Sequence, residues 1–169
     1  MTFQRKLIPV LVILGLLLSL IPAFAPERTE PLTVNMAVSA RAKLTLSVSA
    51  INFPDADPDT VPSIPATENP VTVTAKVRTG VSTTATLTHR SSGDLTAGVG
   101  ITIPISNVSW TATGPGYVGG TMSSSSNVPA GSWTGSGIYS GAFNYSIANR
   151  WTYATGNYTV STTFTLTAP

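Results

Sequence analysis

The strongest constraint on the fold is an alternation of residue types between positions 32 and 48. Every even position is apolar, and the odd positions are polar except for Ala37. Successive side chains of a β-strand point to opposite faces, so the pattern predicts a ribbon with one dry face. Unbroken, it would span about 55 Å, whereas a strand has about 5–6 residues. We expect a bend or bulge within one domain, or a first half, Leu32 to Ala42, that pairs elsewhere.

The N-terminus has the pattern of an export signal. Arg5 and Lys6 precede an uncharged, apolar run over residues 7–25 that ends in Ala23-Phe24-Ala25. A basic start, an apolar middle and a small-x-small end predict a secretory signal over residues 1–25. Pro26 is unfavourable after a cleavage point, and the run approaches the length of a membrane span, so a retained anchor is the alternative. We expect a linker over 26–31, a secreted, extracellular location at the cell surface, and membrane contact only through an uncleaved N-terminal segment.

Charge and composition exclude several classes. The nine Lys and Arg include Arg5 and Lys6, so seven basic residues balance seven acidic ones from residue 26 onward. Without a basic stripe in the sequence we do not expect nucleic-acid binding. The chain has no cysteine, so a β-sheet core must stabilise it without disulfides.

The remainder of the chain predicts short strands separated by turns. Two alternating runs, 71–77 and 83–88, predict a hairpin, and Pro104 predicts an edge strand near residues 101–105. Further strands are expected at 108–112, 138–147 and 158–168, with a long loop over 54–70 and a mobile Gly/Ser-rich loop around Met122. We therefore predict an all-β fold, an immunoglobulin-like antiparallel β-sandwich forming a single domain over residues 32–169 with a long N-terminal strand.

Three short segments resemble known surface domains. Leu44 to Phe53 resembles the opening strand of WxL-type cell-surface domains and of pilin or spore-coat-like subunits. Tyr158 to Pro169 is similar to the terminal segment of WxL domains, with Phe164 in place of a Trp. Thr155 to Tyr158 resembles the tyrosine corner of immunoglobulin-like sandwiches. The resemblance implies a secreted bacterial β-sandwich attached non-covalently to the cell wall, with polysaccharide or peptidoglycan as partner.

Aromatic and acidic residues supply the candidate sites. Trp133 and Trp151, in turn-rich surroundings, are candidates for stacking on sugar rings, whereas Trp110, Phe143 and Phe164 are expected in the core. The acidic triplet Asp55, Asp57 and Asp59 could surround Ca²⁺, but we expect a solvated turn in which Asp caps its own backbone, and no metal.

No catalytic constellation is present in the sequence. His89 is the only histidine and is expected in an exposed turn, without a nucleophile elbow or oxyanion-hole glycines nearby. We expect no enzyme activity, catalytic residue or cofactor.

The sequence favours a non-catalytic bacterial surface protein with a structural or adhesive role. One alternative is a fibre or pilin-like subunit in which the first half of the ribbon, with Leu32, Val34, Met36 and Val38 on one face, adds a strand to a neighbouring molecule. The other is a carbohydrate-binding module.

Overall fold

A computed structural model describes residues 28–169, which divide into two compact units, up to Met36 and from Ala37 to Pro169. Each unit is described by itself. Residues 28–36 have no regular secondary structure, and every one of them is exposed. The predicted signal, residues 1–25, and the first two residues of the predicted linker lie outside the described part of the chain.

The second unit is built from β-strands. No α-helix occurs within residues 37–169, and one turn of 3-10 helix, η1, covers Ile105–Asn107. The strands are β1 (Arg41–Leu46), β2 (Ser63–Pro65), β3 (Val71–Arg78), β4 (Thr84–Ser91), β5 (Leu95–Thr96), β6 (Thr102–Ile103), β7 (Val108–Thr113), β8 (Gly120–Thr121), β9 (Val128–Thr134), β10 (Gly137–Ala148) and β11 (Thr162–Thr167). Within residues 28–169, no helix is long and apolar enough to cross a membrane.

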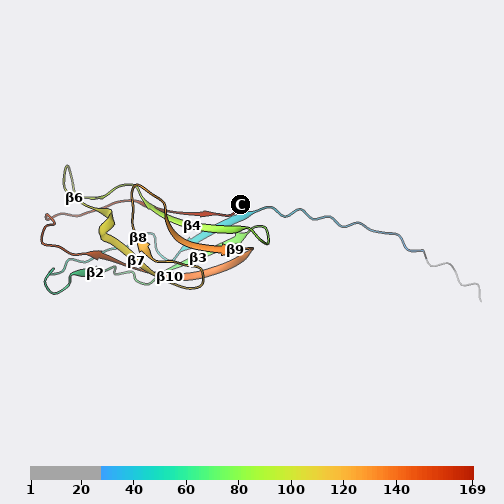
Figure 1. Cartoon of the computed structure of the whole chain (residues 1–169), viewed down its shortest axis with the longest axis horizontal. Helices are drawn as coiled ribbons and strands as arrows, with labels where there is room; N and C mark the ends of the chain where they lie inside the picture. The colour runs from blue at the N-terminus through green and yellow to red at the C-terminus, as the bar shows by residue number, and fades with distance from the viewer. Residues whose placement is uncertain (1–27) are drawn as a thin grey trace, which may run out of the picture. The chain divides into compact units, whose positions relative to one another are not determined.

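Two antiparallel sheets form a β-sandwich (Figure 1). The larger sheet has the order β1-β3-β10-β7-β8, with β2 paired to β10, and the second has the order β11-β4-β9. A small β5-β6 pair completes the strands. Buried side chains from both sheets form one core cluster. The predicted all-β, antiparallel fold is confirmed at this level.

Alternation along the central strands explains why the sheets pack face to face. Val71, Val73, Ala75 and Val77 of β3 are buried, and the residues between them are not. Burying one apolar side chain of this size contributes about 1.5–3 kcal/mol, so one face of such a strand is driven into the core. The alternation predicted for residues 71–77 is confirmed.

Three predictions of local structure are wrong. β3 and β4 do not form a hairpin, because β3 pairs with β1 and β10 while β4 pairs with β11 and β9. The two strands belong to different sheets, and their apolar side chains are part of the same core. The long ribbon contains a strand only at β1, since residues 31–40 have no strand. Trp133 lies within β9 and not in a turn. The segment after β8 is a loop, as expected, and its first residue, Met122, is buried at 5% exposure.

Candidate functional site: the groove between β1 and β11

Two strand edges border the same gap between the sheets. β1 pairs only with β3, and β11 pairs only with β4, so each strand is the edge of its sheet. The two strands approach each other across the sandwich. Arg41 pairs with Arg78, and the Thr79 hydroxyl donates to the carbonyl of Pro169, so β1 begins where β11 ends (Figure 1). The strands therefore run in opposite directions along the gap, and each has one side of its backbone without a strand partner.

A groove of about 330 Å³ opens between these edges. Its β1 side consists of Leu44, Leu46 and the segment that follows them to Ile51, and its β11 side consists of residues 162–164. The remaining lining residues come from β3, β4, β10 and the segment after β8: Val71, His89, Tyr145 and Met122. The lining is thus mainly apolar, and it is framed by two edges that can hydrogen-bond to an added backbone.

His89 is a buried residue of the groove lining. It is only 2% exposed, its ring stacks on Phe164 at a centroid distance of 3.9 Å, and Trp110 meets it edge-on at 5.3 Å. Neither ring nitrogen has a hydrogen-bond partner among residues 28–169. The prediction of an exposed turn histidine is wrong, because β4 continues to Ser91. His89 shares the inward face of β4 with Ala85 and Leu87, and extending that alternation by two residues would have located it.

Burial controls the charge of His89. Removal from water lowers the pKa of the imidazole to about 4, because the charged form loses its hydration. The side chain is therefore neutral at pH 7. Burial also raises the pKa of the Tyr145 hydroxyl, the other titratable group in the groove lining. The groove is uncharged at neutral pH and suits an apolar occupant.

The two candidate sugar-binding tryptophans have different environments. Trp133 is 6% exposed, stacks on Tyr139 at 5.0 Å, and donates from Nε1 to the Pro115 carbonyl. It has no free ring face, so its burial argues against a binding role. Trp151 is 70% exposed, and its Nε1 donates to Oδ1 of Asp59 at 3.0 Å. Of the pair, only Trp151 presents its ring to a ligand.

The acidic triplet belongs to a braced loop. Asp57 accepts a hydrogen bond from the backbone N–H of Asp59 through Oδ1 at 2.9 Å, as in an Asx turn. The Asn149 side chain donates to the carbonyls of Ala56 and Val61 and holds the loop against the end of β10. No group of three or more metal-ligating side chains occurs within residues 28–169. Asp57 therefore accepts a hydrogen bond from the backbone, and Asp59 accepts one from Trp151.

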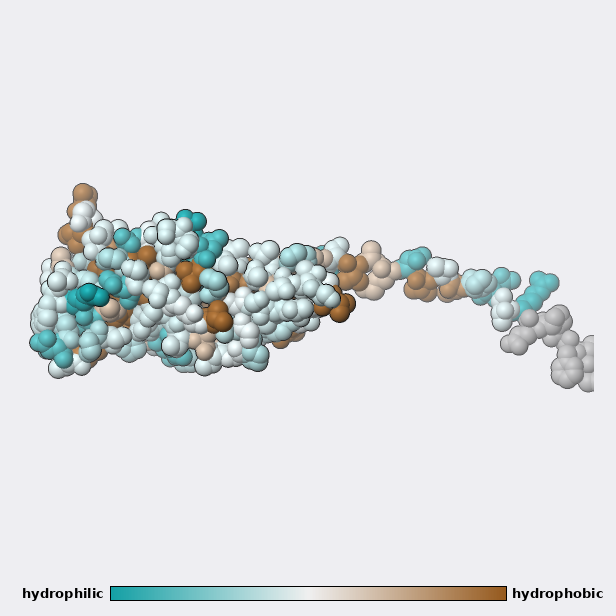
Figure 2. All heavy atoms as spheres, in the orientation of Figure 1, coloured by the Kyte–Doolittle hydropathy of each residue, from teal (hydrophilic) through white to brown (hydrophobic). Residues whose placement is uncertain are grey.

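The candidate self-association residues are exposed apolar side chains. Leu32 is 87% exposed, Val34 and Met36 are each 83% exposed, and Val38 is 57% exposed. Figure 2 shows hydrophobic residues recurring along this N-terminal segment, whereas the face of the sandwich in this view is mostly hydrophilic or of intermediate hydropathy. Scattered exposed apolar residues are ordinary, but a run at every second position is the pattern of a strand without a sheet.

Comparison with known proteins finds no family model that matches this chain and no curated protein similar to it. The functional interpretation therefore depends on the groove and its borders. Two strand edges offer backbone donors and acceptors, and an apolar lining offers room for side chains at alternate positions. This combination fits an extended peptide better than a small polar substrate.

Proposed function

We propose that this chain is a secreted, non-catalytic structural protein of the bacterial surface that assembles by strand addition. In this proposal, residues Leu32–Val38 of one copy occupy the groove between β1 and β11 of another copy. The proposal includes an immunoglobulin-like sandwich of the WxL, pilin or spore-coat type. The Tyr158 hydroxyl, which donates to the Ala154 carbonyl at 2.7 Å, supports that comparison because a tyrosine corner makes such a bond.

One observation carries the proposal: an apolar groove with two strand edges, in a chain that also has an exposed, strictly alternating apolar segment. An added strand gains main-chain hydrogen bonds from a sheet edge, and its alternate side chains fill pockets. Leu32, Val34, Met36 and Val38 would face the groove lining. Thr33 and Asn35, on the opposite face, would stay in water.

In this proposal the exchanged segment is shorter than the first half of the ribbon, Leu32 to Ala42. Ala42 lies within β1 and pairs with Val77, and Arg41 pairs with Arg78. Both residues are therefore committed to their own sheet. The exchanged segment is Leu32–Val38 instead of the longer Leu32 to Ala42, and Ser39 and Ala40 connect it to β1.

The test uses the chain without its predicted signal, which begins at residue 26. In this chain we expect Val34→Lys to prevent assembly. A lysine at this position would place a charge against an apolar lining, and burial of an unpaired charge is strongly unfavourable. Asn35→Lys is the matched control, because it adds the same charge one residue further along, on the solvent face. Size-exclusion chromatography with light scattering should show monomers for Val34→Lys and unchanged assembly for Asn35→Lys.

Deletion of residues 32–38 separates assembly from folding. The truncated chain should remain monomeric, and a peptide covering residues 30–40 should raise its melting temperature, because a ligand that binds only the folded state stabilises it. If the truncated chain assembles as the intact chain does, strand addition is wrong.

A carbohydrate-binding role is the second candidate, and the exposed ring of Trp151 favours it. Its Nε1 bond to Asp59 fixes one edge of the indole and leaves the ring faces accessible for stacking on a sugar. Titration with soluble peptidoglycan fragments or wall polysaccharide should then quench tryptophan fluorescence in the intact chain but not in Trp151→Ala. Equal responses from the two proteins would exclude this site.

A further inference from the structure

Four basic side chains gather on the outer face of the larger sheet. Arg41 of β1 is the direct cross-strand partner of Arg78 of β3, and Lys43 is the direct partner of Lys76. All four residues are exposed. Residues two apart on a strand share a face, so the two pairs form one patch, here called the basic face. It contains four of the six Lys and Arg residues found after Ala37.

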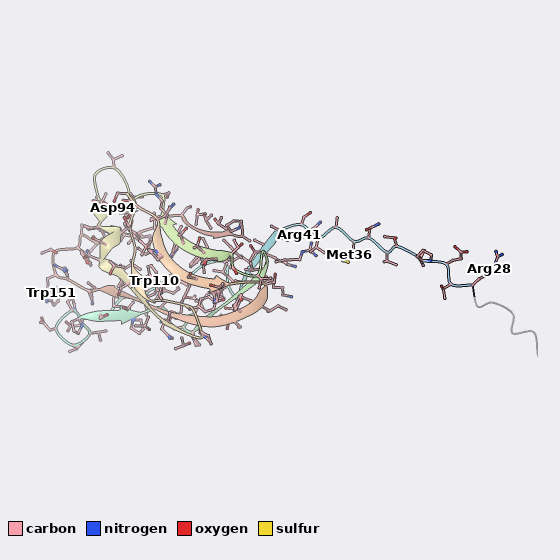
Figure 3. The ribbon with its side chains drawn as sticks, turned by 45° about the vertical axis from the view of Figure 1, so that its right-hand side comes forward. Arg28, Met36, Arg41, Asp94, Trp110 and Trp151 are labelled. Atoms are coloured by element: carbon pink, nitrogen blue, oxygen red, sulfur yellow. The ribbon has the colours of Figure 1, made fainter. Side chains whose placement is uncertain are left out.

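The acidic residues lie toward the other end of the sandwich. Figure 3 shows Arg41 and Trp151 at opposite ends of the domain, and Asp59 is hydrogen-bonded to Trp151. Asp55 and Asp57 belong to the same loop as Asp59. Glu68 precedes β3 at the end away from Arg78, and its carboxylate accepts hydrogen bonds from the backbone and side chain of Asn52. We call Asp55, Asp57, Asp59 and Glu68 the acidic loops.

The basic face does not help the isolated domain to fold. Like charges directly opposite each other on neighbouring strands are destabilising. The pairs Arg41–Arg78 and Lys43–Lys76 place two such repulsions side by side, about 20 Å or more from the acidic loops along β3. A contact that brings negative charge to this face would remove the repulsion.

We propose that the basic face of one copy contacts the acidic loops of the next copy, so that the molecules assemble head to tail. This inference rests on the proposed strand addition and names the second surface of the same interface. Opposite charge at the two ends makes each molecule complementary to another copy of itself. Such complementarity steers encounter and selects orientation more than it adds affinity.

The connection between Leu32–Val38 and β1 is short, so the exchanged segment ends close to the basic face of its own copy. Arg78 donates from Nε to the Ser39 carbonyl at 2.8 Å, so the segment leaves its own domain at the basic face. Only Ser39 and Ala40 separate Val38 from Arg41, so their Cα atoms are at most about 10 Å apart. A segment seated in a neighbour's groove therefore brings its own basic face close to one end of that groove.

The position of the acidic loops indicates at which end of the receiving groove the basic face of the other copy would lie. The β1 side of the groove continues from Leu44 to Ile51, and the next residue, Asn52, holds the Glu68 carboxylate. A strand parallel to β1 of the receiving copy would leave the groove there and carry its basic face to these carboxylates. A strand in the reverse direction would leave beside the receiving copy's own basic face. The charges favour the parallel direction.

A charge exchange tests the contact. Lys43→Glu with Lys76→Glu leaves Arg41 and Arg78 and so cancels the net charge of the basic face. Asp55→Lys with Asp59→Lys leaves Asp57 and Glu68 and so cancels the net charge of the acidic loops. Each double variant alone should assemble at least about tenfold more slowly at low ionic strength, as measured by light scattering. An equimolar mixture should associate faster than either variant alone, because the unaltered basic face of one variant then meets the unaltered acidic loops of the other. Arg28→Glu with Arg90→Glu is the control for the basic-face variant, since it changes the net charge by the same amount and alters neither the basic face nor the acidic loops.

Salt provides an independent measurement. Raising the ionic strength from about 0.01 M to about 1 M shortens the Debye length from about 30 Å to about 3 Å, and it should remove the rate difference between the variants and the original chain. Circular dichroism and melting temperature check that each variant is folded.

Failure of recovery in the mixture, or equal slowing by the control, would overturn the head-to-tail contact. If the basic-face variant assembles normally but no longer binds an anionic polymer such as polyphosphate, the face serves a polyanion and the proposal is wrong. These outcomes leave strand addition intact, which is overturned separately if the chain without residues 32–38 still assembles.

Discussion

At the residue scale, His89 is an imidazole without a hydrogen-bond partner in an apolar groove. Its pKa falls from about 6.5 in the unfolded chain to about 4 in the folded one, so the unfolded chain binds more protons between these values. Its neutral form is fully compatible with folding above pH 6.5, and stability is lost as the pH falls toward 4. We expect a loss of about 2–3 kcal/mol between pH 7 and pH 4.5 from this residue.

Replacement by an apolar ring isolates that contribution. His89→Phe removes the titration and both unpartnered nitrogens, while it keeps a ring to stack on Phe164. Urea unfolding should show equal or greater stability of His89→Phe at pH 7 and a smaller loss at pH 4.5 than in the original chain. The carboxylates titrate in both proteins, so their contribution cancels in the comparison. Parallel pH profiles for the two proteins would mean that His89 does not sense the acid.

At the scale of the elements, alternation predicts which face of a strand is buried but not which strand lies beside it. The inward faces of β3 and of the C-terminal part of β10 follow directly from the residue pattern. The pairing of β3 with β10 instead of β4 does not, because a strand with one apolar face can bury it beside a neighbour or across the core. The predicted hairpin failed for this reason.

The groove was also beyond prediction, although each border was visible in the sequence. Leu44, Leu46 and Phe164 belong to alternating runs, and the sequence assigns no partner strand within the chain to the first half of the ribbon, Leu32 to Ala42. What the sequence could not supply was the topology that makes β1 and β11 the edges of different sheets on the same side of the sandwich. The prediction of an exposed His89 failed because it followed from the polarity of the side chain and not from its position in the alternation of β4.

At the scale of the whole molecule, the sequence concealed an asymmetry of charge. Seven basic residues balance seven acidic ones after the predicted signal, and no basic stripe is visible along the chain. The strand register creates the basic face. It pairs Arg41 and Lys43 of β1 with Arg78 and Lys76 of β3, which lies more than thirty residues further along the chain. Only paired strands put the four cations on one face, and Arg41 of this face lies at the end of the domain opposite Trp151, the partner of Asp59 (Figure 3).

The direction of the added strand follows from this polarity and can be measured with disulfides, because the chain has no cysteine of its own. Val38 of one copy should lie near Ile51 of the receiving copy, and Leu32 should lie near Leu44. A disulfide forms only where two Cα atoms lie within about 4.4–6.8 Å, so it reports the register directly. We expect Val38→Cys chains mixed with Ile51→Cys chains to cross-link on oxidation, and Val38→Cys chains mixed with Leu44→Cys chains to cross-link much less.

A cysteine at the other end of the segment, Leu32→Cys, provides the complementary measurement. Leu32→Cys chains should cross-link with Leu44→Cys chains and not with Ile51→Cys chains, as judged by gel electrophoresis without reductant. The inverse pattern would show a strand parallel to β11, which brings basic face to basic face. In that arrangement assembly should speed up with salt instead of slowing, because screening then relieves repulsion between the copies instead of weakening their attraction. The cross-links and the salt dependence must therefore agree for the head-to-tail direction to hold.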